Sequence, residues 1–219
     1  MIFVNYKTFE ESSGPKALTL TKILEETAGE MEIKIIPVVQ IIDAESVIAS
    51  TKLEVWIQHV DPISFGAHTG WTLPEEAARI GVSGVFLNHS EHKFDSFDAL
   101  YTANEKAMSA NLKTLIFAGS LDELKKIVTL APTYVAYEPP ELVGSTTTSV
   151  AEAQPEIISQ AVEIARAAGL PLIVGAGIHS LKDVKKSLEL GAVGVAVATD
   201  IVKAVDPKKE LLDLIEGFK

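Results

Sequence analysis

The sequence of 219 residues contains no cysteine and only three methionines. Without cysteine the chain forms neither a disulfide nor a metal site with thiolate ligands. It also has no stretch near the roughly 18 uninterrupted apolar residues of a membrane-spanning helix. The first residues, MIFVNYKTFE, lack the basic segment and apolar run of a secretory signal peptide, so we expect a cytoplasmic protein.

Positive charge is scarce as well. Nineteen Lys and Arg stand against 30 Asp and Glu, which gives a net charge of −11. This balance argues against general binding to nucleic acid or to anionic membranes. A net-acidic protein with an anionic substrate must build a local positive site, and backbone N–H groups at helix starts can do so.

Short apolar runs rich in β-branched residues alternate with helical patterns along the whole chain. The expected strands are Ile2–Asn5, Ile33–Val39, Glu54–His59, Gly84–Asn88, Lys113–Phe117, Tyr134–Tyr137, Leu172–Gly175 and Gly194–Ala198. Most are apolar throughout, which is typical of strands buried on both faces of a parallel sheet. Among the helices, Glu156–Ala168 is expected to bury Ile157, Ala161, Ile164, Ala165 and Ala168, while Ser120 and Ser180 mark helix starts.

Strict alternation of strand and helix implies a parallel sheet, and no linker divides the chain. Two architectures satisfy this pattern: a closed barrel or an open doubly wound sheet. The count of eight strand–helix units favours a closed (β/α)8 TIM barrel, as a single domain over residues 1–219.

In such a barrel, chemistry belongs at the carboxyl ends of the strands. The polar residues at these ends are Asn5, Lys7, His59, His89, Glu91 and Glu138, and small-residue turns follow the last two strands at Gly175-Ala176-Gly177 and Ala198-Thr199. Each has an ordinary alternative, such as a surface lysine, a structural histidine, a loop glutamate or a tight turn. Their joint placement at one end of the barrel predicts an active site.

The two glycine and alanine turns are candidates for a phosphate site. Small residues let the backbone approach a ligand closely, and free N–H groups at a helix start bind anions. The loops after strands seven and eight are also the recurrent phosphate site of this barrel. The alternative is that they are simply tight turns.

Glu138 ends an apolar strand and precedes Pro139-Pro140, which stiffen the chain. The long loop that follows carries an apolar tip, Leu142-Val143. A loop that closes over a ligand excludes water and makes a carboxylate beneath it a stronger base. The alternative is an ordinary loop glutamate.

The spacing of His89 and His92 resembles a metal-binding pair. No third ligand cluster is evident, and a turn after a strand does not stack the two side chains as a helix would. We therefore expect no metal and no cofactor.

Four motifs in order resemble the triosephosphate isomerase family, in its short archaeal branch. They are Asn5-Tyr6-Lys7, Gly66-Ala67-His68-Thr69-Gly70, His89-Ser90-Glu91 and Glu138-Pro139-Pro140-Glu141-Leu142-Val143-Gly144. The resemblance implies an isomerase of glycolysis and gluconeogenesis that interconverts glyceraldehyde 3-phosphate and dihydroxyacetone phosphate. A glutamate base paired with a neutral histidine is a known example of this family's chemistry.

The resemblance also implies residue roles. Glu138 would be the base, His89 the electrophile and Lys7 the positive charge, with Asn5 lining the site and Glu91 supporting it. The substrate-binding residues would be Asn5, Tyr6, Lys7, Val143, Gly144, Gly177, Ala198 and Thr199. Thr69 and Trp71 would lie in an interface with another copy of the chain, in a homotetramer built as a dimer of dimers.

Three departures from the family pattern stand out. The lid runs Gly144-Ser145-Thr146-Thr147-Thr148, where a Gly-Thr-Gly-Ile-Pro run is usual, and His92 follows the His-Ser-Glu motif. The turn after strand eight ends in Asp200, a carboxylate beside an expected phosphate. We predict that Asp200 points away from the phosphate and caps the helix that follows.

Two other functions remain open on the sequence alone. One is another phosphate-binding barrel isomerase, of the indole- or histidine-pathway kind, which would lack the ordered motif set. The other is a non-catalytic barrel, against which the presence of Lys7, His89 and Glu138 argues.

Overall fold

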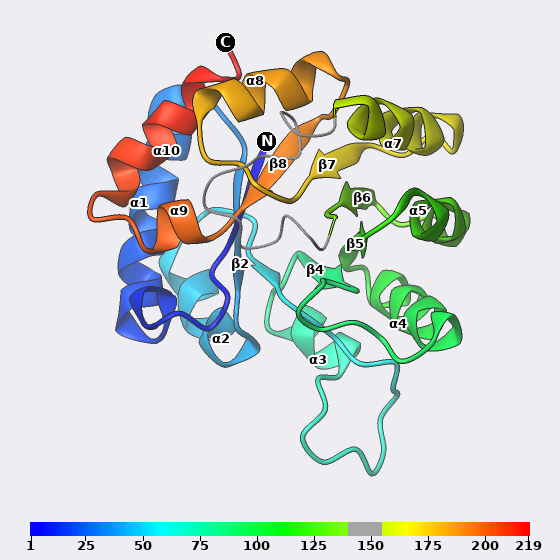
Figure 1. The fold of residues 1–219 in the computed structure, drawn as a ribbon. Coiled ribbons are helices and arrows are strands. Elements are labelled where there is room, and N and C mark those ends of the chain that lie inside the picture. Colours follow the sequence, from blue (N-terminus) through cyan, green and yellow to red (C-terminus); the bar gives the residue numbers. More distant parts are fainter. Residues whose placement is uncertain (140–154) are drawn as a thin grey trace.

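The computed structural model describes residues 1–139 and 155–219 as eight parallel strands that close into a barrel surrounded by helices (Figure 1). Each strand pairs with the next, and β8 pairs with β1 through Ile2 and Val195. The closed barrel predicted from the sequence is therefore confirmed, and the open sheet is excluded. No helix in these two ranges is long and apolar enough to cross a membrane.

The strands are β1 (Ile2–Asn5), β2 (Ile35–Val39), β3 (Trp56–Ile57), β4 (Gly84–Leu87), β5 (Lys113–Ala118), β6 (Tyr134–Tyr137), β7 (Leu172–Val174) and β8 (Gly194–Val197). The helices are α1 (Pro15–Met31), α2 (Ile41–Ser50), α3 (Pro74–Arg79), α4 (Phe97–Ser109), α5 (Leu121–Ile127), α7 (Pro155–Ala167), α8 (Leu181–Glu189), α9 (Thr199–Val202) and α10 (Pro207–Glu216), with short 3₁₀ turns at Glu10–Ser12 and Val128–Leu130.

The barrel interior is a packed aromatic core. Phe3 lies 5.1 Å from Trp56 and 5.6 Å from Phe86, measured between ring centres. Gly84 makes room for the indole, since a Cβ there would come within 2.3 Å of Trp56. Because side chains fill the interior, a ligand has access at the ends of the strands and not through the barrel.

The second core lies between the strands and the helices and fixes how each helix faces the barrel. α7 buries Ile158, Ala161, Val162 and Ala165. The expected stripe was therefore partly wrong: its two middle alanines are buried, but the buried face also takes Ile158 and Val162, and Ala168 is exposed. Ile157 and Ile164 pack at the edge of this core instead.

Both predicted serine helix starts are confirmed. The Ser120 hydroxyl accepts a hydrogen bond from the Glu123 N–H at 3.1 Å. At Ser180 the Asp183 carboxylate accepts from the Ser180 N–H at 2.9 Å. These caps satisfy backbone groups that a helix start leaves unpaired, and so fix where α5 and α8 begin.

Candidate active site

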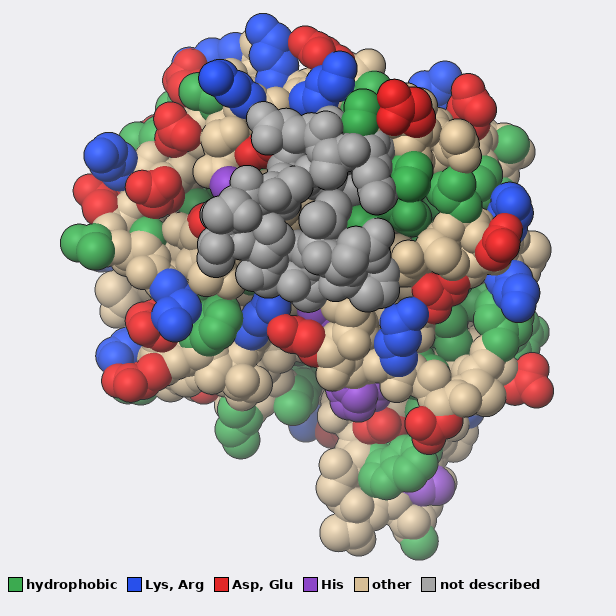
Figure 2. Space-filling model, viewed as in Figure 1, with side chains coloured by type: hydrophobic (Ala, Val, Ile, Leu, Met, Phe, Trp, Pro, Cys, Tyr) green, Lys and Arg blue, Asp and Glu red, His purple; other side chains and the backbone are tan. Residues whose placement is uncertain are grey.

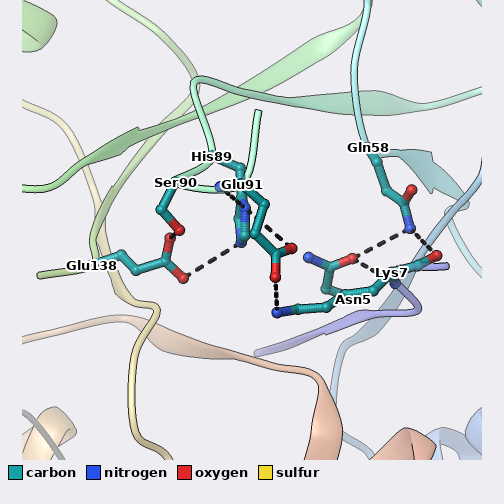
Figure 3. Close-up of polar contacts among 7 residues, drawn as sticks. All are labelled: Asn5, Lys7, Gln58, His89, Ser90, Glu91 and Glu138. Carbon is teal, nitrogen blue, oxygen red and sulfur yellow. Dashed lines mark hydrogen bonds and ion pairs between the residues drawn. The ribbon is translucent and has the colours of Figure 1, made fainter. Parts of the chain in front are cut away.

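The first strand delivers Asn5 and Lys7 to a cavity of about 430 Å³ at the carboxyl end of the barrel. Lys7 has a φ of 47°, a left-handed conformation that costs a non-glycine residue roughly 1–2 kcal/mol. Two hydrogen bonds hold it there: Asn5 Oδ1 accepts from the Lys7 N–H at 3.0 Å, and Gln58 Nε2 donates to the Lys7 carbonyl at 2.8 Å. Lys7 Nζ lies 2.7 Å from Glu91 Oε1 (Figure 3).

The turn after β4 positions His89. Asn88 has a φ of 60°, and its amide donates to the Phe117 carbonyl at 3.0 Å. The His89 ring packs edge-on against Phe117, with 4.9 Å between the ring centres. Its Nδ1 accepts from the Glu91 N–H at 3.1 Å. A ring nitrogen that accepts a hydrogen bond carries no proton, so this imidazole is neutral and presents its proton on Nε2.

Glu138 continues the β5–β6 pairing through its N–H, which donates to the Ala118 carbonyl at 2.9 Å. The residue is only 4% exposed. Oε2 accepts from the Ser90 hydroxyl at 2.9 Å, and Oε1 lies 3.5 Å from His89 Nε2 (Figure 3). A shielded carboxylate thus meets the N–H of a neutral imidazole.

These groups form a site suited to moving a proton. The carboxylate of Glu138 can accept a proton, while His89 Nε2–H and the Lys7 ammonium can stabilise negative charge on a neighbouring oxygen. The structure therefore brings Asn5, Lys7, His89, Glu91 and Glu138 together, as their strand-end positions predicted.

Some predicted residues lie elsewhere or outside the described ranges. The Tyr6 side chain is fully buried in the outer core, where its hydroxyl lies 2.8 Å from Thr21 Oγ1 of α1. Burial raises the pKa of this phenol far above its usual value. Only the Tyr6 backbone is left to approach a ligand. Val143 and Gly144, with the rest of the expected lid, lie outside the described residues.

The two expected phosphate turns follow neighbouring strands, since β7 pairs with β8. Gly177 has a φ of 61°, a conformation that a residue without a side chain adopts readily. Ala198 and Thr199 open the short helix α9.

The prediction that Asp200 caps this helix was wrong. Ala198 occupies the cap position, and Asp200 lies in the first turn with its carboxylate 2.9 Å from His179 Nδ1. The following helix, α10, is capped by Asp206 instead. The carboxylate is instead bound by His179, 21 residues earlier in the sequence, and a local sequence pattern does not predict such a contact.

Two polar residues of the site were missed as functional candidates. Gln58 fixes the backbone of Lys7, and Ser90 holds Glu138. The expected strand over Glu54–His59 named His59 as its polar end, but β3 has only two paired residues, Trp56 and Ile57. Counting from that pairing would have identified Gln58 as the first polar residue at the end of the strand.

His59 and His92 line the side of the cavity next to the projecting loop, the exposed residues 64–71 between β3 and α3. Their rings stack with centres 4.0 Å apart, and His59 Nε2 lies 3.3 Å from Asp61 Oδ1. His92 thus stacks on His59, while the ring of His89 contacts Glu138 and Phe117. Asp61 Oδ2 in turn accepts from the Thr72 N–H at 2.6 Å, which closes the base of the loop.

The position of His59 predicts that acid lowers the stability of the folded protein. Burial, and next the adjacent His92, hold the pKa of His59 below its ordinary value of 6.5, against the opposing effect of Asp61. The unfolded chain therefore takes up this proton more readily, and the His59 contribution to stability is lost as pH falls from 6.5 toward the lowered pKa. In thermal unfolding, His59→Phe, which keeps a flat ring that cannot be protonated, should lose less melting temperature between pH 7 and pH 5 than the wild type does.

His68, an exposed histidine on the projecting loop, provides the control. His68→Phe should retain the wild-type pH dependence. Equal acid losses in the wild type and in His59→Phe would contradict the role of His59.

Thr69 and Trp71 lie on this loop, which stands clear of the barrel between β3 and α3 (Figures 1 and 2). Every residue from 64 to 71 is exposed, and Trp71 exposes 54% of its surface and Phe65 70%. The structure thus places both predicted interface residues on an exposed surface with large apolar side chains.

A closed barrel with a carboxylate, an imidazole and an ammonium group at the carboxyl ends of its strands is characteristic of (β/α)8-barrel enzymes that use acid–base chemistry. Known proteins narrow this class. The model of the triosephosphate isomerase family matches residues 1–217, and the chain belongs to that family. The resemblance found in the four motifs is therefore confirmed.

Individual members of this family are similar to the chain over nearly its full length. The chain is 39% identical to a triosephosphate isomerase of Metallosphaera sedula over 218 residues, which are 99% of this chain and 95% of that protein. It is 36% identical to one of Methanobrevibacter smithii, over 98% of this chain and 97% of the relative. With one of Methanocaldococcus jannaschii the identity is 34%, over 99% of both chains.

Proposed function

We propose that this chain interconverts glyceraldehyde 3-phosphate and dihydroxyacetone phosphate, as a triosephosphate isomerase with Glu138 as base and His89 as electrophile. The observation that carries the proposal is the position of the buried Glu138 carboxylate, 3.5 Å from His89 Nε2. Family membership supplies the reaction, and this pair supplies the groups that the reaction needs.

The proposed chemistry moves one proton. Glu138 takes a proton from the carbon that bears the hydroxyl, beside the substrate's carbonyl, while His89 Nε2–H donates to the carbonyl oxygen. The electrons of the broken C–H bond form the double bond of an enediolate. Glu138 then returns its proton to the neighbouring carbon, and proton exchange between the two oxygens completes the isomerisation. No oxidant or reductant is needed.

Lys7 and Asn5 would favour this intermediate. The ammonium lies in the same cavity as His89 and is only 17% exposed, so its charge is weakly screened. In the absence of substrate it pairs with Glu91, whose backbone N–H also fixes the tautomer of His89. We therefore assign Glu91 the part of positioning both groups.

The phosphate would bind to the backbone at Gly177, Ala198 and Thr199, together with Val143 and Gly144. Backbone N–H groups suit a protein whose net charge is −11, because they attract an anion without adding basic side chains. No cofactor takes part in the proposed steps.

A coupled assay tests this proposal directly. Purified protein should convert glyceraldehyde 3-phosphate into dihydroxyacetone phosphate, detected by its reduction with NADH and a glycerol-phosphate dehydrogenase. Absence of turnover at high enzyme concentration would contradict the proposal and favour a non-catalytic barrel. Turnover of a different phosphorylated substrate instead would favour another barrel isomerase.

We also propose that the chain forms homo-oligomers through the projecting loop, as a dimer of dimers. The exposure of Trp71 and Phe65 supports this, since large apolar side chains on a protruding loop gain stability when another surface covers them. A cytoplasmic location stays a prediction.

Charged replacements on this loop should dissociate the oligomer. Thr69→Glu or Trp71→Glu would bury an unpaired carboxylate in the interface, which typically costs several kcal/mol. We expect slower-sedimenting species with at least about tenfold lower kcat, because each site would lose support from the neighbouring loop. Val205→Glu, at a fully exposed apolar position outside this loop, should change neither property. Fully active monomers would contradict the proposed role.

A further inference from the structure

The loops after β7 and β8 are joined by a hydrogen bond between two side chains that the proposed chemistry does not use. His179, two residues after Gly177, places Nδ1 2.9 Å from Asp200 Oδ2, which lies next to Thr199. The pair therefore lies between the two turns that we propose to bind the phosphate. Within residues 1–139 and 155–219, Nε2 of the same ring has no hydrogen-bond partner, so Asp200 is the side chain that holds it.

Both partners are fixed by their own elements. The His179 N–H donates to Asp183 Oδ2 at 3.1 Å, so the backbone of His179 is tied to the first turn of α8. Asp200 is part of α9, where the Val202 N–H donates to the Ala198 carbonyl at 2.9 Å. This anchoring places the carboxylate beside the turn of Ala198 and Thr199.

This carboxylate presents an electrostatic problem. A phosphate dianion at Gly177, Ala198 and Thr199 would be repelled by Asp200, in a protein that already carries a net charge of −11. The ring of His179 counters this repulsion, because its Nδ1 lies 2.9 Å from Asp200 Oδ2 and its N–H can hold the carboxylate in a hydrogen bond.

We propose that His179 is a positioning residue that acts through Asp200: its ring holds the carboxylate in a hydrogen bond and so lets the loops after β7 and β8 accept the substrate's phosphate. The proposal rests on the proposed function, because it assigns these loops to the phosphate. It predicts that removing the histidine alone harms substrate binding, while removing both the histidine and the carboxylate charge does not.

A double-mutant cycle tests the proposal. His179→Ala should raise KM for glyceraldehyde 3-phosphate about tenfold, equivalent to about 1.4 kcal/mol, with kcat changing less than about threefold. The effect is no larger because the Asp200 side chain is 39% exposed and water screens its charge. Asp200→Asn should leave KM within about threefold of the wild type, since the amide oxygen still accepts from the ring. The double variant should return KM to within about threefold of the wild type, because no negative charge is left to offset.

Inorganic phosphate serves as the probe for the loops alone. Its inhibition constant in competition with the substrate should change as KM does. The constant should rise in His179→Ala and return toward the wild-type value in the double variant. Lys208→Ala is the matched control: it breaks a contact of the same length, 2.9 Å between Lys208 Nζ of α10 and Glu30 Oε1 of α1, outside the two phosphate loops. It should leave both constants unchanged.

The outcomes separate this inference from the proposed function. An active wild type whose KM is unchanged by His179→Ala overturns the inference alone, and so does a double variant as impaired as the single one. A wild type without isomerase turnover overturns the proposed function. In that case calorimetric binding of inorganic phosphate decides the inference: about tenfold weaker binding in His179→Ala with recovery in the double variant supports it, and equal binding overturns it.

Discussion

Replacing Glu138 by aspartate is expected to lower kcat by about 100- to 1000-fold while KM changes little. The shorter side chain withdraws the carboxylate by about one methylene from a position that the backbone fixes, since the Glu138 N–H is bonded to the Ala118 carbonyl. The neighbours cannot follow this withdrawal: His89 is held by Phe117 and by the Glu91 N–H. Substrate binding should persist because the phosphate loops are untouched.

Steady-state kinetics of the isomerisation in both directions would measure this effect. The matched control is Glu163→Asp, the same change at an exposed position of α7, which should keep wild-type kinetics. Ser90→Ala provides a graded comparison, because it removes the 2.9 Å hydrogen bond to Glu138 but keeps the base. If Glu138→Asp turned over at a near-normal rate, the base would have to be another residue.

The arrangement of the active-site residues could be predicted from the sequence because the fold itself brings the ends of the strands together. Eight apolar runs separated by helices favour a parallel barrel, and a parallel barrel brings all carboxyl ends of its strands to one face. Asn5, Lys7, His89 and Glu138 each lie at the end of such a run or within two residues of it, so their convergence could be predicted without knowing the side-chain directions.

Side-chain direction at the strand ends was harder to predict, because successive residues point to opposite sides. Tyr6 shows this: its neighbours Asn5 and Lys7 line the cavity, whereas its ring packs in the outer core against α1. A shift of one residue likewise separates the missed Gln58 from the expected His59. Patterns of hydrophobicity fix the location of a strand more firmly than its last paired residue.

Contacts between distant segments were not predictable at all. The pair of His179 and Asp200 joins two loops. In the sequence alone, an aspartate just before a helix is typical of a helix cap. Asn88 is similar: its left-handed backbone is set by bonds to Phe117 and Glu123, 29 and 35 residues further on. Such residues acquire their role only when the barrel closes.

Lys7→Ala is expected to lower kcat by about 100-fold or more and to raise KM as well. The ammonium is the positive side chain described in this cavity, and it stands beside the site where the enediolate would form. Its removal also leaves Glu91 without its 2.7 Å partner, so a free carboxylate would face an anionic substrate. The kcat effect would come from the lost stabilisation of the enediolate, and part of the KM effect from the exposed charge of Glu91.

Pairing this change with Glu91→Gln separates the two effects. The double variant should recover much of the KM, since the repelling charge is gone, but not the kcat, because no cation is left to stabilise the intermediate. Lys16→Ala is the matched control, as it breaks an exposed pair with Glu10 of the same 2.7 Å length on the outside of the barrel. Retention of both wild-type KM and kcat by Lys7→Ala would show that the enediolate is stabilised by His89 and backbone groups alone. A double variant that regained kcat would show that Lys7 serves only to neutralise Glu91.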